Sequence, residues 1–175
     1  MKILVTGIPG SGKTTLVNYA TSIGNKNFLD SDNIKELSEW REFNTGKIVK
    51  VTNENRANNK DEWHKKYGWF WDENQLSILL NKSESIILCG SSENVTSFFK
   101  LFDKIIILKI TREELIKNLN NPQRTNPFGK TDNQRIGLME WQDFLIKEAI
   151  PYNPTIISTN EIKSIYTEVT NFAKT

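Results

Sequence analysis

The sequence contains very little of the chemistry that holds disulfide-rich or zinc-binding proteins together. Its 175 residues include one cysteine, Cys89, and one histidine, His64. A single cysteine excludes an internal disulfide framework, and these two residues leave too few ligands for a zinc site. Any metal ion is therefore expected to arrive together with a bound ligand.

The sequence also lacks an excess of charge of either sign and any long apolar run. Its 23 basic and 21 acidic residues give a formal net charge of +2, which is too small to steer the protein towards nucleic acid or a membrane surface. No apolar segment approaches the length that crosses a bilayer. Residues 1–6 are expected to form a strand, which excludes a cleaved signal there. These features predict a cytoplasmic protein with a single domain over residues 1–175.

At its start the sequence carries a phosphate-binding motif. Residues 7–14 read G-I-P-G-S-G-K-T and fit the pattern G-x-x-x-x-G-K-[ST]. A strand is expected before the motif at residues 3–6 and a helix after it at residues 13–22. In this setting the glycines let backbone N–H groups converge on phosphate oxygens at the positive end of the helix dipole. The motif predicts binding of a nucleoside triphosphate.

The motif also predicts a role for its own side chains. Lys13 is expected to neutralise the β- and γ-phosphates, and the hydroxyl of Thr14 is expected to bind Mg²⁺. The predicted nucleotide-binding residues are Gly7, Pro9, Gly10, Ser11, Gly12, Lys13, Thr14 and Thr15. Lys13 is in addition a predicted catalytic residue.

Beyond the motif, short apolar strands alternate with helical patterns. The expected strands cover residues 3–6, 27–30, 85–89, 104–110 and 155–158, and a closing amphipathic helix covers residues 161–173. Such alternation is typical of a parallel sheet covered by helices. The predicted fold class is α/β, with three layers around a five-stranded parallel sheet.

Two intervals break this alternation. Residues 33–82 are polar and rich in tryptophan, and residues 120–135 carry Pro122 and Pro127. Ligands of open parallel sheets bind beyond the carboxyl ends of the strands, where such long excursions leave the sheet. The first interval is therefore predicted to bind a substrate and the second to form a lid.

Two aspartates follow the second expected strand. Asp30 and Asp32 are two residues apart, so both point to the same side of an extended backbone. Beside a triphosphate, one carboxylate could hold Mg²⁺ through water while the other accepts a proton from an attacking hydroxyl. The alternative is that Asp32 only caps a helix that begins at residues 33–36. The pairing of the two carboxylates favours the first interpretation.

The lid interval carries two candidate catalytic arginines, Arg124 as the first choice and Arg135 as the second. A guanidinium that arrives with a closing lid stabilises charge on a phosphoryl group in transfer and excludes water. The alternative is a solvated basic loop without a catalytic role.

The tryptophan-rich interval combines aromatic and basic residues. Aromatic faces stack on bases or sugars and arginines grip carboxylate or phosphate, so the acceptor could be a nucleotide, a nucleoside or an anionic metabolite. Arg41 and Arg56 are the candidate substrate-binding residues, because two cations in such an insertion need a counter-charge. The tryptophans are more simply explained as core, with residues 69–71 on the buried side of a helix. His64 and Cys89 are expected to be packing residues.

Three segments together resemble the small-molecule kinases of the phosphate-loop superfamily: the motif at residues 7–15, L-D-S-D-N-I at residues 29–34 and L-K-I-T-R-E-E-L at residues 108–115. Shikimate, gluconate, adenylylsulfate and adenylate kinases belong to this group, and the resemblance is to the group and not to one member. It implies a substrate-binding insertion after the second strand, a lid after the fourth, and transfer of the γ-phosphoryl group of ATP to a hydroxyl or phosphate. It also implies that Asp30 lies near Mg²⁺ and Asp32 near the acceptor hydroxyl, with ATP and Mg²⁺ as cofactors.

Two departures from the group concern the acceptor and the adenine. Where shikimate kinase has a triple-glycine turn after its third strand, this sequence keeps only Gly90, which is the predicted substrate contact there. Many of these kinases stack an arginine on adenine from the helix after the fourth strand, where residues 117–118 are lysine and asparagine. Adenine contact is therefore expected from Arg124 or from the loop at residues 158–160, where Asn160 is the candidate residue.

Three functions stay open at this point. The first is ATP-dependent phosphoryl transfer to a small molecule. The second is a kinase for the 5′-hydroxyl of a nucleic-acid end, since single strands stack on aromatic residues. The third is a nucleotide-dependent ATPase switch, which is less favoured because the strand expected at residues 85–89 is followed by no acid before Glu93. The sequence specifies neither the acceptor nor the oligomeric state.

Overall fold

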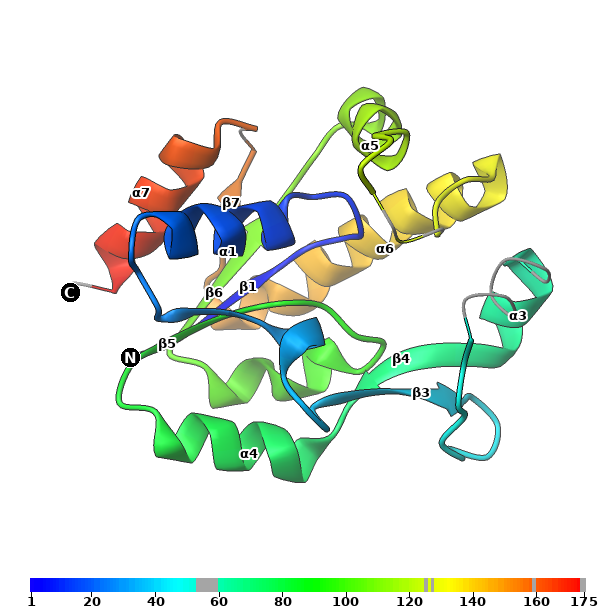
Figure 1. Ribbon diagram of the computed structural model, residues 1–175, viewed down its shortest axis with the longest axis horizontal. Helices are drawn as coiled ribbons and strands as arrows, with labels where there is room; N and C mark the ends of the chain where they lie inside the picture. The colour runs from blue at the N-terminus through cyan, green and yellow to red at the C-terminus, as the bar shows by residue number, and fades with distance from the viewer. Residues whose placement is uncertain (53–59, 125, 127, 159, 174–175) are drawn as a thin grey trace.

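Five parallel strands form the centre of the structure (Figure 1). The computed structural model describes residues 1–52, 60–124, 126, 128–158 and 160–173. The strands are β1 (Lys2–Thr6), β2 (Phe28–Asp30), β5 (Ile86–Cys89), β6 (Lys104–Leu108) and β7 (Thr155–Ile157). They lie in the order β2-β5-β1-β6-β7, and every neighbouring pair is parallel. The predicted five-stranded parallel sheet is confirmed.

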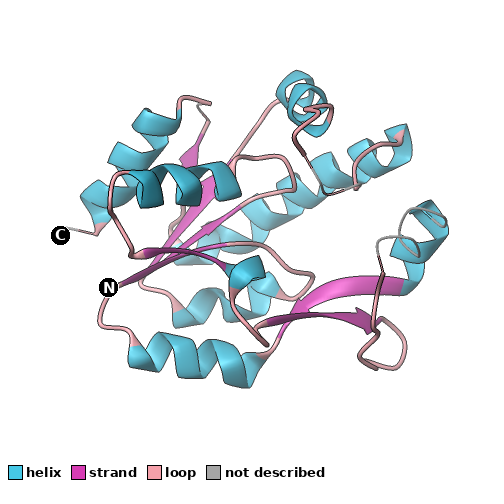
Figure 2. Cartoon of the chain, viewed as in Figure 1, coloured by secondary structure: helices cyan, strands magenta, loops and turns pink. Residues whose placement is uncertain are grey.

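Helices cover both faces of this sheet (Figure 2). One face carries α1 (Lys13–Ser22) and α7 (Ile162–Phe172), and the other carries α4 (Glu73–Lys82), α6 (Asp132–Ala149) and the 3-10 segment Val95–Leu101. A further helix, α5 (Arg112–Leu119), packs on α6 beyond the strand ends. The α/β class and its three layers are therefore confirmed.

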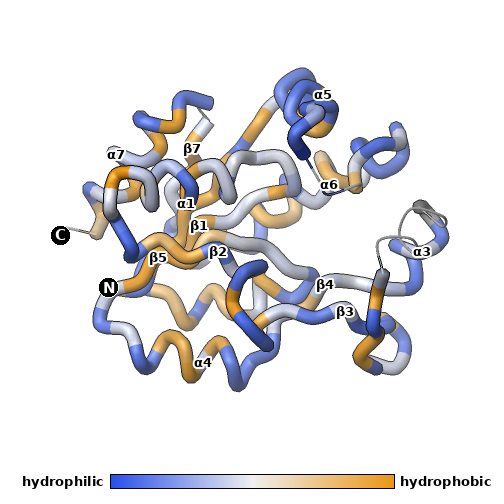
Figure 3. The backbone as a smooth tube through the Cα atoms, viewed as in Figure 1, coloured by the Kyte–Doolittle hydropathy of each residue, from blue (hydrophilic) through white to orange (hydrophobic). Residues whose placement is uncertain are grey.

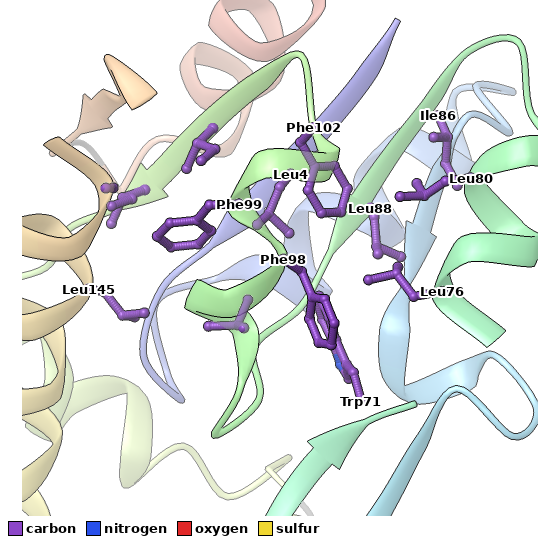
Figure 4. Close-up of a cluster of buried hydrophobic side chains, with 14 of the residues drawn as sticks. Leu4, Trp71, Leu76, Leu80, Ile86, Leu88, Phe98, Phe99, Phe102 and Leu145 are labelled. Atoms are coloured by element: carbon purple, nitrogen blue, oxygen red, sulfur yellow. The ribbon is translucent and has the colours of Figure 1, made fainter. Parts of the chain in front are cut away.

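Side chains alternate between the two faces of the sheet along β1, which explains why each face has its own hydrophobic cluster. Leu4 belongs to the cluster under α4 and α6, whereas Ile3 and Val5 belong to the cluster under α1 and α7. Figure 4 shows Leu4 in the first cluster, near Phe99 and Leu88. Because both faces are covered, the strands are apolar at almost every position, and hydrophobic residues gather along the middle of the molecule (Figure 3).

The predicted substrate insertion contains a second, smaller sheet. Its strands β3 (Ser38–Glu42) and β4 (Tyr67–Trp71) pair in antiparallel fashion, with α3 (Lys60–Lys66) directly before β4. In Figure 1 this hairpin and α3 lie on the side of the molecule away from the amino end and from the end of α7. The insertion therefore extends from the sheet at the carboxyl ends of its strands, as predicted.

The interpretation of residues 69–71 as part of a helix is wrong. They lie in β4, where Trp69 is opposite Trp40 across the hairpin, and the helix α4 begins only after its N-cap Asp72. Pairing with a distant strand satisfies the main-chain hydrogen bonds as a helix would, and it adds cross-strand ring contacts that a local helix would not offer. Trp71 is 1% exposed, as predicted for a core tryptophan.

The predicted lid interval connects α5 to α6. Thr131 caps α6 by accepting a hydrogen bond from the backbone N–H of Gln134, so residues 132–135 already belong to the helix. Cys89 is buried in the core, as expected. In the part of the chain that the structure describes, no helix combines the length and the apolar character needed to cross a bilayer.

Candidate active site

The phosphate motif forms the loop between β1 and α1. Gly12 is the N-cap of α1 with a φ of 98°, which L side chains rarely adopt, and no side chain caps this helix end. The first N–H groups of the helix therefore lack an acceptor within the helix, and they point outward at the positive end of its dipole. This arrangement fits a phosphate group as the cap of α1.

Helix α5 packs against the phosphate loop. Leu115 and Leu119 are fully buried in a cluster with Ile8, and a Cβ on Gly10 would come within 3.3 Å of Leu115. Asn118 donates a 2.9 Å hydrogen bond from its Nδ2 to the carbonyl oxygen of Gly10. Nothing in the sequence pattern points to this contact, because Asn118 and the loop are far apart in the chain.

Lys13 lies among the carbonyl groups of the loop. Its Nζ donates hydrogen bonds of 2.6 Å to the carbonyl oxygen of Gly7 and 3.0 Å to that of Ile8. Burial lowers the pKa of Lys13 from 10.5 to about 8, against the opposing attraction of Asp32 and Asp30. An ammonium group held by uncharged carbonyl and hydroxyl oxygens gains stronger partners when phosphate oxygens arrive.

The structure brings the two predicted aspartates to this loop. Asp30 is 8% exposed at the end of β2, and its carboxylate accepts a 3.0 Å hydrogen bond from the backbone N–H of Asp32. Asp30 thereby caps the short 3-10 turn Ser31–Asn33. The alternative prediction, that Asp32 caps a helix, is wrong, because the cap is formed by Asp30. The side chain of Asp32 takes no part in this cap, and its charge acts on Lys13 in the loop.

Asp32 is held by a tryptophan of the insertion. Trp69 donates a 3.0 Å hydrogen bond from Nε1 to Oδ1 of Asp32, and Ser31 Oγ lies 3.4 Å from the same oxygen. Although much of the Asp32 residue is exposed, the protein around its carboxylate raises the pKa of Asp32 by desolvation, which the Trp69 bond partly offsets. A raised pKa suits a carboxylate that accepts a proton near neutral pH. Trp69 is a site residue that the sequence pattern identified only as core.

The donor atoms at the loop fit a magnesium ion that arrives with a nucleotide. The described residues include no group of three or more His, Cys, Asp or Glu side chains that could hold a metal by themselves. Thr14, exposed in the first turn of α1, and Asp30 offer hard oxygen donors. Mg²⁺ commonly combines one or two such ligands with phosphate oxygens and water.

Of the two lid arginines, Arg124 lies towards the phosphate loop. Its Nη1 donates hydrogen bonds of 2.5 Å to the carbonyl oxygen of Asn126 and 2.7 Å to that of Phe128. The charge of Arg124 is also one of the influences that lower the pKa of Lys13. Its position is therefore compatible with the predicted catalytic role.

Arg135 instead ties the base of the lid together. Its Nε donates to the carbonyl oxygen of Gly129 at 3.1 Å, and its Nη groups contact Asp132 at 3.2 Å and Asn120 at 3.3 Å. These partners come from both ends of the lid interval. The contacts of the Arg135 guanidinium with Gly129, Asp132 and Asn120 therefore lie within the lid interval.

Of the two predicted substrate cations, the structure describes Arg41, and it does not bring Arg41 to the aspartate pair. Arg41 forms ion pairs with Glu39 and, at 3.4 Å, with Asp72. Because side chains alternate along a strand, Arg41 lies on the opposite face of the hairpin from Trp69. The counter-charge that the sequence argument sought in a substrate is supplied by these two carboxylates. Arg56 lies outside the described residues.

Gly90 is needed for a close approach beside the aspartate pair. It is buried directly after β5, and a Cβ there would stand 2.0 Å from Oγ of Ser31 and 2.8 Å from the ring of Trp71. Any other residue would displace the turn that carries the two aspartates. Its predicted contact with a substrate stays a prediction.

Asn160 lies in the loop between β7 and α7 and donates a hydrogen bond from Nδ2 to the carboxylate of Glu114. Glu114 also completes a capping box with Thr111 at the start of α5. The loop predicted to contact adenine is therefore joined to the helix that supports the phosphate loop.

No family model matches the sequence, and no curated protein matches it either. Solved structures do share its fold over nearly the whole chain. The shikimate kinase from Acinetobacter baumannii in complex with shikimate has a TM-score of 0.60 at 16% identity, covering 98% of this chain and 91% of its own. The deoxyadenosine kinase from M. mycoides with bound dATP has a TM-score of 0.61 at 12% identity over 100% of both chains. A gluconokinase from Sinorhizobium meliloti 1021 has a TM-score of 0.51 at 13% identity over 95% of this chain and 87% of its own.

At these identities the likeness concerns the fold and leaves the acceptor open. The similar structures are kinases of three different small molecules, and each is matched over most of its length. With a phosphate loop after β1, an insertion after β2 and a second excursion before α6, the chain has the fold of the phosphate-loop small-molecule kinases.

Proposed function

We propose that the protein is a kinase that transfers the γ-phosphoryl group of ATP to a hydroxyl or phosphate of a small molecule. The main observation in support is that Lys13 and the aspartate pair converge at the uncapped end of α1. A phosphate loop alone accounts for nucleotide binding. A carboxylate with a raised pKa beside it adds a group that can take a proton from an attacking hydroxyl.

In this proposal each side chain has one task. Lys13 exchanges the loop carbonyls for the β- and γ-phosphates, and Thr14 and Asp30 hold Mg²⁺, which when bound neutralises phosphate charge. The acceptor oxygen forms a bond to the γ-phosphorus and passes its proton to Asp32, while the bond to the bridging oxygen breaks and ADP leaves with its electron pair. Arg124 stabilises the charge on the equatorial oxygens.

The test is ADP release from ATP and Mg²⁺ in the presence of a panel of nucleosides, nucleotides, sugar acids and a 5′-hydroxyl oligonucleotide. An acceptor-dependent rate should disappear in Lys13→Ala and persist in Lys26→Ala, which removes an exposed lysine outside the loop. Full activity of a folded Lys13→Ala variant would refute the proposal. Slow ADP release that depends on Lys13 but on no acceptor would favour the ATPase switch instead.

A nucleic-acid 5′-hydroxyl kinase is the second candidate, because several aromatic rings of the insertion are only half-buried. Stacking and phosphate contacts would then bind a single strand. Oligonucleotide binding that falls steeply with salt would favour this candidate, since released counterions make such binding salt-dependent. An absence of oligonucleotide binding would exclude this candidate.

A further inference from the structure

A series of neighbouring aromatic rings begins at Trp69, which contacts Asp32. Four half-buried rings form it, and we refer to them as the aromatic shelf: Trp40, His64, Trp69 and Phe128. Trp69 connects the shelf to the candidate base, because its Nε1 is hydrogen-bonded to Asp32. A molecule whose hydroxyl reaches Asp32 must therefore lie alongside this indole.

The shelf is a supported structure. Trp40 and Trp69 are directly opposite each other across the hairpin, with ring centroids 5.3 Å apart. Behind them Trp63, only 7% exposed, packs edge-on against Trp40 at 4.6 Å. The rings of Trp40 and Trp69 are tilted by 55° to each other, so the shelf offers separate apolar ring faces. The fold itself meets the cost of ordering these rings.

The shelf also joins the insertion to the lid. His64 comes from α3 and Phe128 from the lid interval, and their ring centroids are 4.3 Å apart. The carbonyl oxygen of Phe128 accepts the hydrogen bond from Arg124. The same lid segment thus contributes one ring to the shelf and holds the arginine proposed to act on the phosphoryl group.

The charges of the described part of the insertion do not favour an anionic acceptor on the shelf. Arg41 faces the other side of the hairpin and is paired with two carboxylates. Lys65 pairs with Glu62 at 2.6 Å and Lys66 with Glu42 at 3.3 Å. A sugar acid on the shelf would have to draw a cation out of these pairs, or recruit Arg124 or an exposed lysine such as Lys47, whereas an uncharged ring needs only the shelf.

We propose that the acceptor is an uncharged molecule with a planar heterocyclic ring and a hydroxyl group, of the nucleoside class. Its ring lies against the shelf, and its hydroxyl meets the carboxylate of Asp32, which Trp69 positions. This inference rests on the proposed kinase function for the reaction, and on the shelf alone for the binding. In the reaction the hydroxyl oxygen bonds to the γ-phosphorus, its proton goes to Asp32, and ADP leaves.

The first experiment measures acceptor binding without ATP, by calorimetry and by quenching of tryptophan fluorescence. The probes are neutral purine and pyrimidine nucleosides, with shikimate and gluconate as anionic comparators. We expect the nucleosides to bind and Trp40→Ala to weaken that binding at least tenfold, because stacking is lost. Trp40→Phe should retain most of it. Trp141→Phe is the matched control, since Trp141 is half-buried in α6 and stacks on Phe144, outside the shelf.

The second experiment distinguishes two roles of Trp69: its N–H positions the carboxylate of Asp32, and its ring contacts the acceptor. Trp69→Phe keeps an aromatic ring and removes the N–H that bonds Asp32. Nucleoside binding and KM for the acceptor should change by less than a few fold, whereas kcat should fall, because the carboxylate of Asp32 loses the bond that orients it. A loss of binding with an unchanged kcat would contradict the positioning role.

Failure of the inference and failure of the kinase proposal give different results. Sugar acids that bind and turn over, while nucleosides do neither, would overturn the acceptor class and leave the kinase intact. Nucleosides that bind in a Trp40-dependent way without Lys13-dependent ADP release would support the shelf and overturn the kinase. An oligonucleotide that binds much more tightly than any nucleoside would overturn the nucleoside class in favour of a nucleic-acid end. If Trp40→Ala does not fold, His64→Ala provides the same binding test from the neighbouring ring.

Discussion

Lys13 carries a charge that the ligand-free site does not favour. Burial lowers the pKa of Lys13 to about 8, and within the loop its Nζ donates to two carbonyl oxygens and one hydroxyl. Phosphate oxygens favour the ammonium form, so the pKa of Lys13 should rise when ATP binds. Nucleotide binding and protonation of this residue are therefore linked.

The first prediction is that ATP binding takes up a proton above neutral pH. Near pH 8 about half of the ligand-free protein has a neutral Lys13, so binding should take up about half a proton. Calorimetric titrations in two buffers of different ionisation enthalpy measure this number. Lys13→Arg, whose charge does not titrate in this range, should show no uptake in any residual binding. The absence of uptake in the unaltered protein would contradict the assignment.

The second prediction concerns Thr6, the last residue of β1. Its Oγ1 is buried and has no hydrogen-bond partner among the described residues. An unsatisfied buried hydroxyl is unfavourable, so Thr6→Val should raise the free energy of unfolding by up to about 1 kcal/mol. Urea denaturation measures the change.

A matched change elsewhere serves as the control for Thr6→Val. Thr170 in α7 donates a 2.9 Å hydrogen bond from Oγ1 to the carbonyl oxygen of Tyr166. Thr170→Val should therefore lower the free energy of unfolding by about 0.5–1.5 kcal/mol. If Thr6→Val were destabilising to the same degree, its hydroxyl would have a partner such as a buried water.

At the scale of elements, two excursions from the sheet meet above the site. The hairpin of β3 and β4 brings Trp69 to Asp32, and the lid brings Phe128 to His64. Each contact joins segments that a simple strand–helix alternation would leave separate. The geometry of the acceptor side therefore depends on how these two elements dock.

The third prediction separates the two lid arginines. Arg135→Ala removes contacts to Gly129, Asp132 and Asn120 at the base of the lid, so the lid should become less ordered. We expect KM for ATP to rise several-fold and proteolysis within the lid interval to accelerate, with a smaller effect on kcat. Arg124→Ala should instead lower kcat by about 100-fold or more, because a guanidinium that stabilises transferred charge is lost.

Steady-state kinetics and limited proteolysis distinguish the two outcomes. A large fall in kcat for Arg135→Ala, with unchanged proteolysis, would restore Arg135 as a catalytic residue. A kcat for Arg124→Ala close to that of the unaltered protein would remove Arg124 from the mechanism. Lys100→Ala, which removes an exposed cation in the 3-10 segment Val95–Leu101 outside the lid interval, controls for the loss of charge.

At the scale of the whole molecule, the site makes the ligand-free fold less stable than it could be. Desolvation raises the pKa of Asp32, so the folded chain disfavours its ionised form more than the unfolded chain does. Below the ordinary pKa of 3.8 both states are protonated and the penalty is absent. As pH rises through the folded pKa, the penalty becomes complete and then stays constant.

The fourth prediction follows from this increase of the Asp32 penalty with pH. Asp32→Asn should raise the free energy of unfolding at neutral pH, and the gain should vanish as pH falls towards the ordinary pKa of aspartate. Asparagine still offers Oδ1 to the indole of Trp69. Activity should be lost in the same variant, as expected where a site trades stability for function. Denaturation at a series of pH values measures the difference, with Asp143→Asn on the exposed part of α6 as control. A gain that is independent of pH would contradict the linkage.

The strands of the sheet and the phosphate loop could be predicted because their signals are local. Apolar runs bounded by turn residues place all five strands within a few residues of their observed ends, and the helix predicted at residues 13–22 is α1. The hairpin could not be predicted in the same way. Trp40 and Trp69 pair across an intervening segment, and the stability of that pairing comes from their contact and not from either stretch alone.

The sequence by itself determined the phosphate loop, the alternation that builds a parallel sheet, and the presence of two carboxylates at the end of β2. These features depend on neighbouring residues, whose spacing fixes their geometry. Tertiary structure alone decided that Asp30 caps its own turn while Asp32 faces the site, and that Trp69 bonds Asp32. It also decided that Arg41 lies away from the site. Such contacts join residues distant in the chain, and they form only when the packing of the whole molecule brings those residues together.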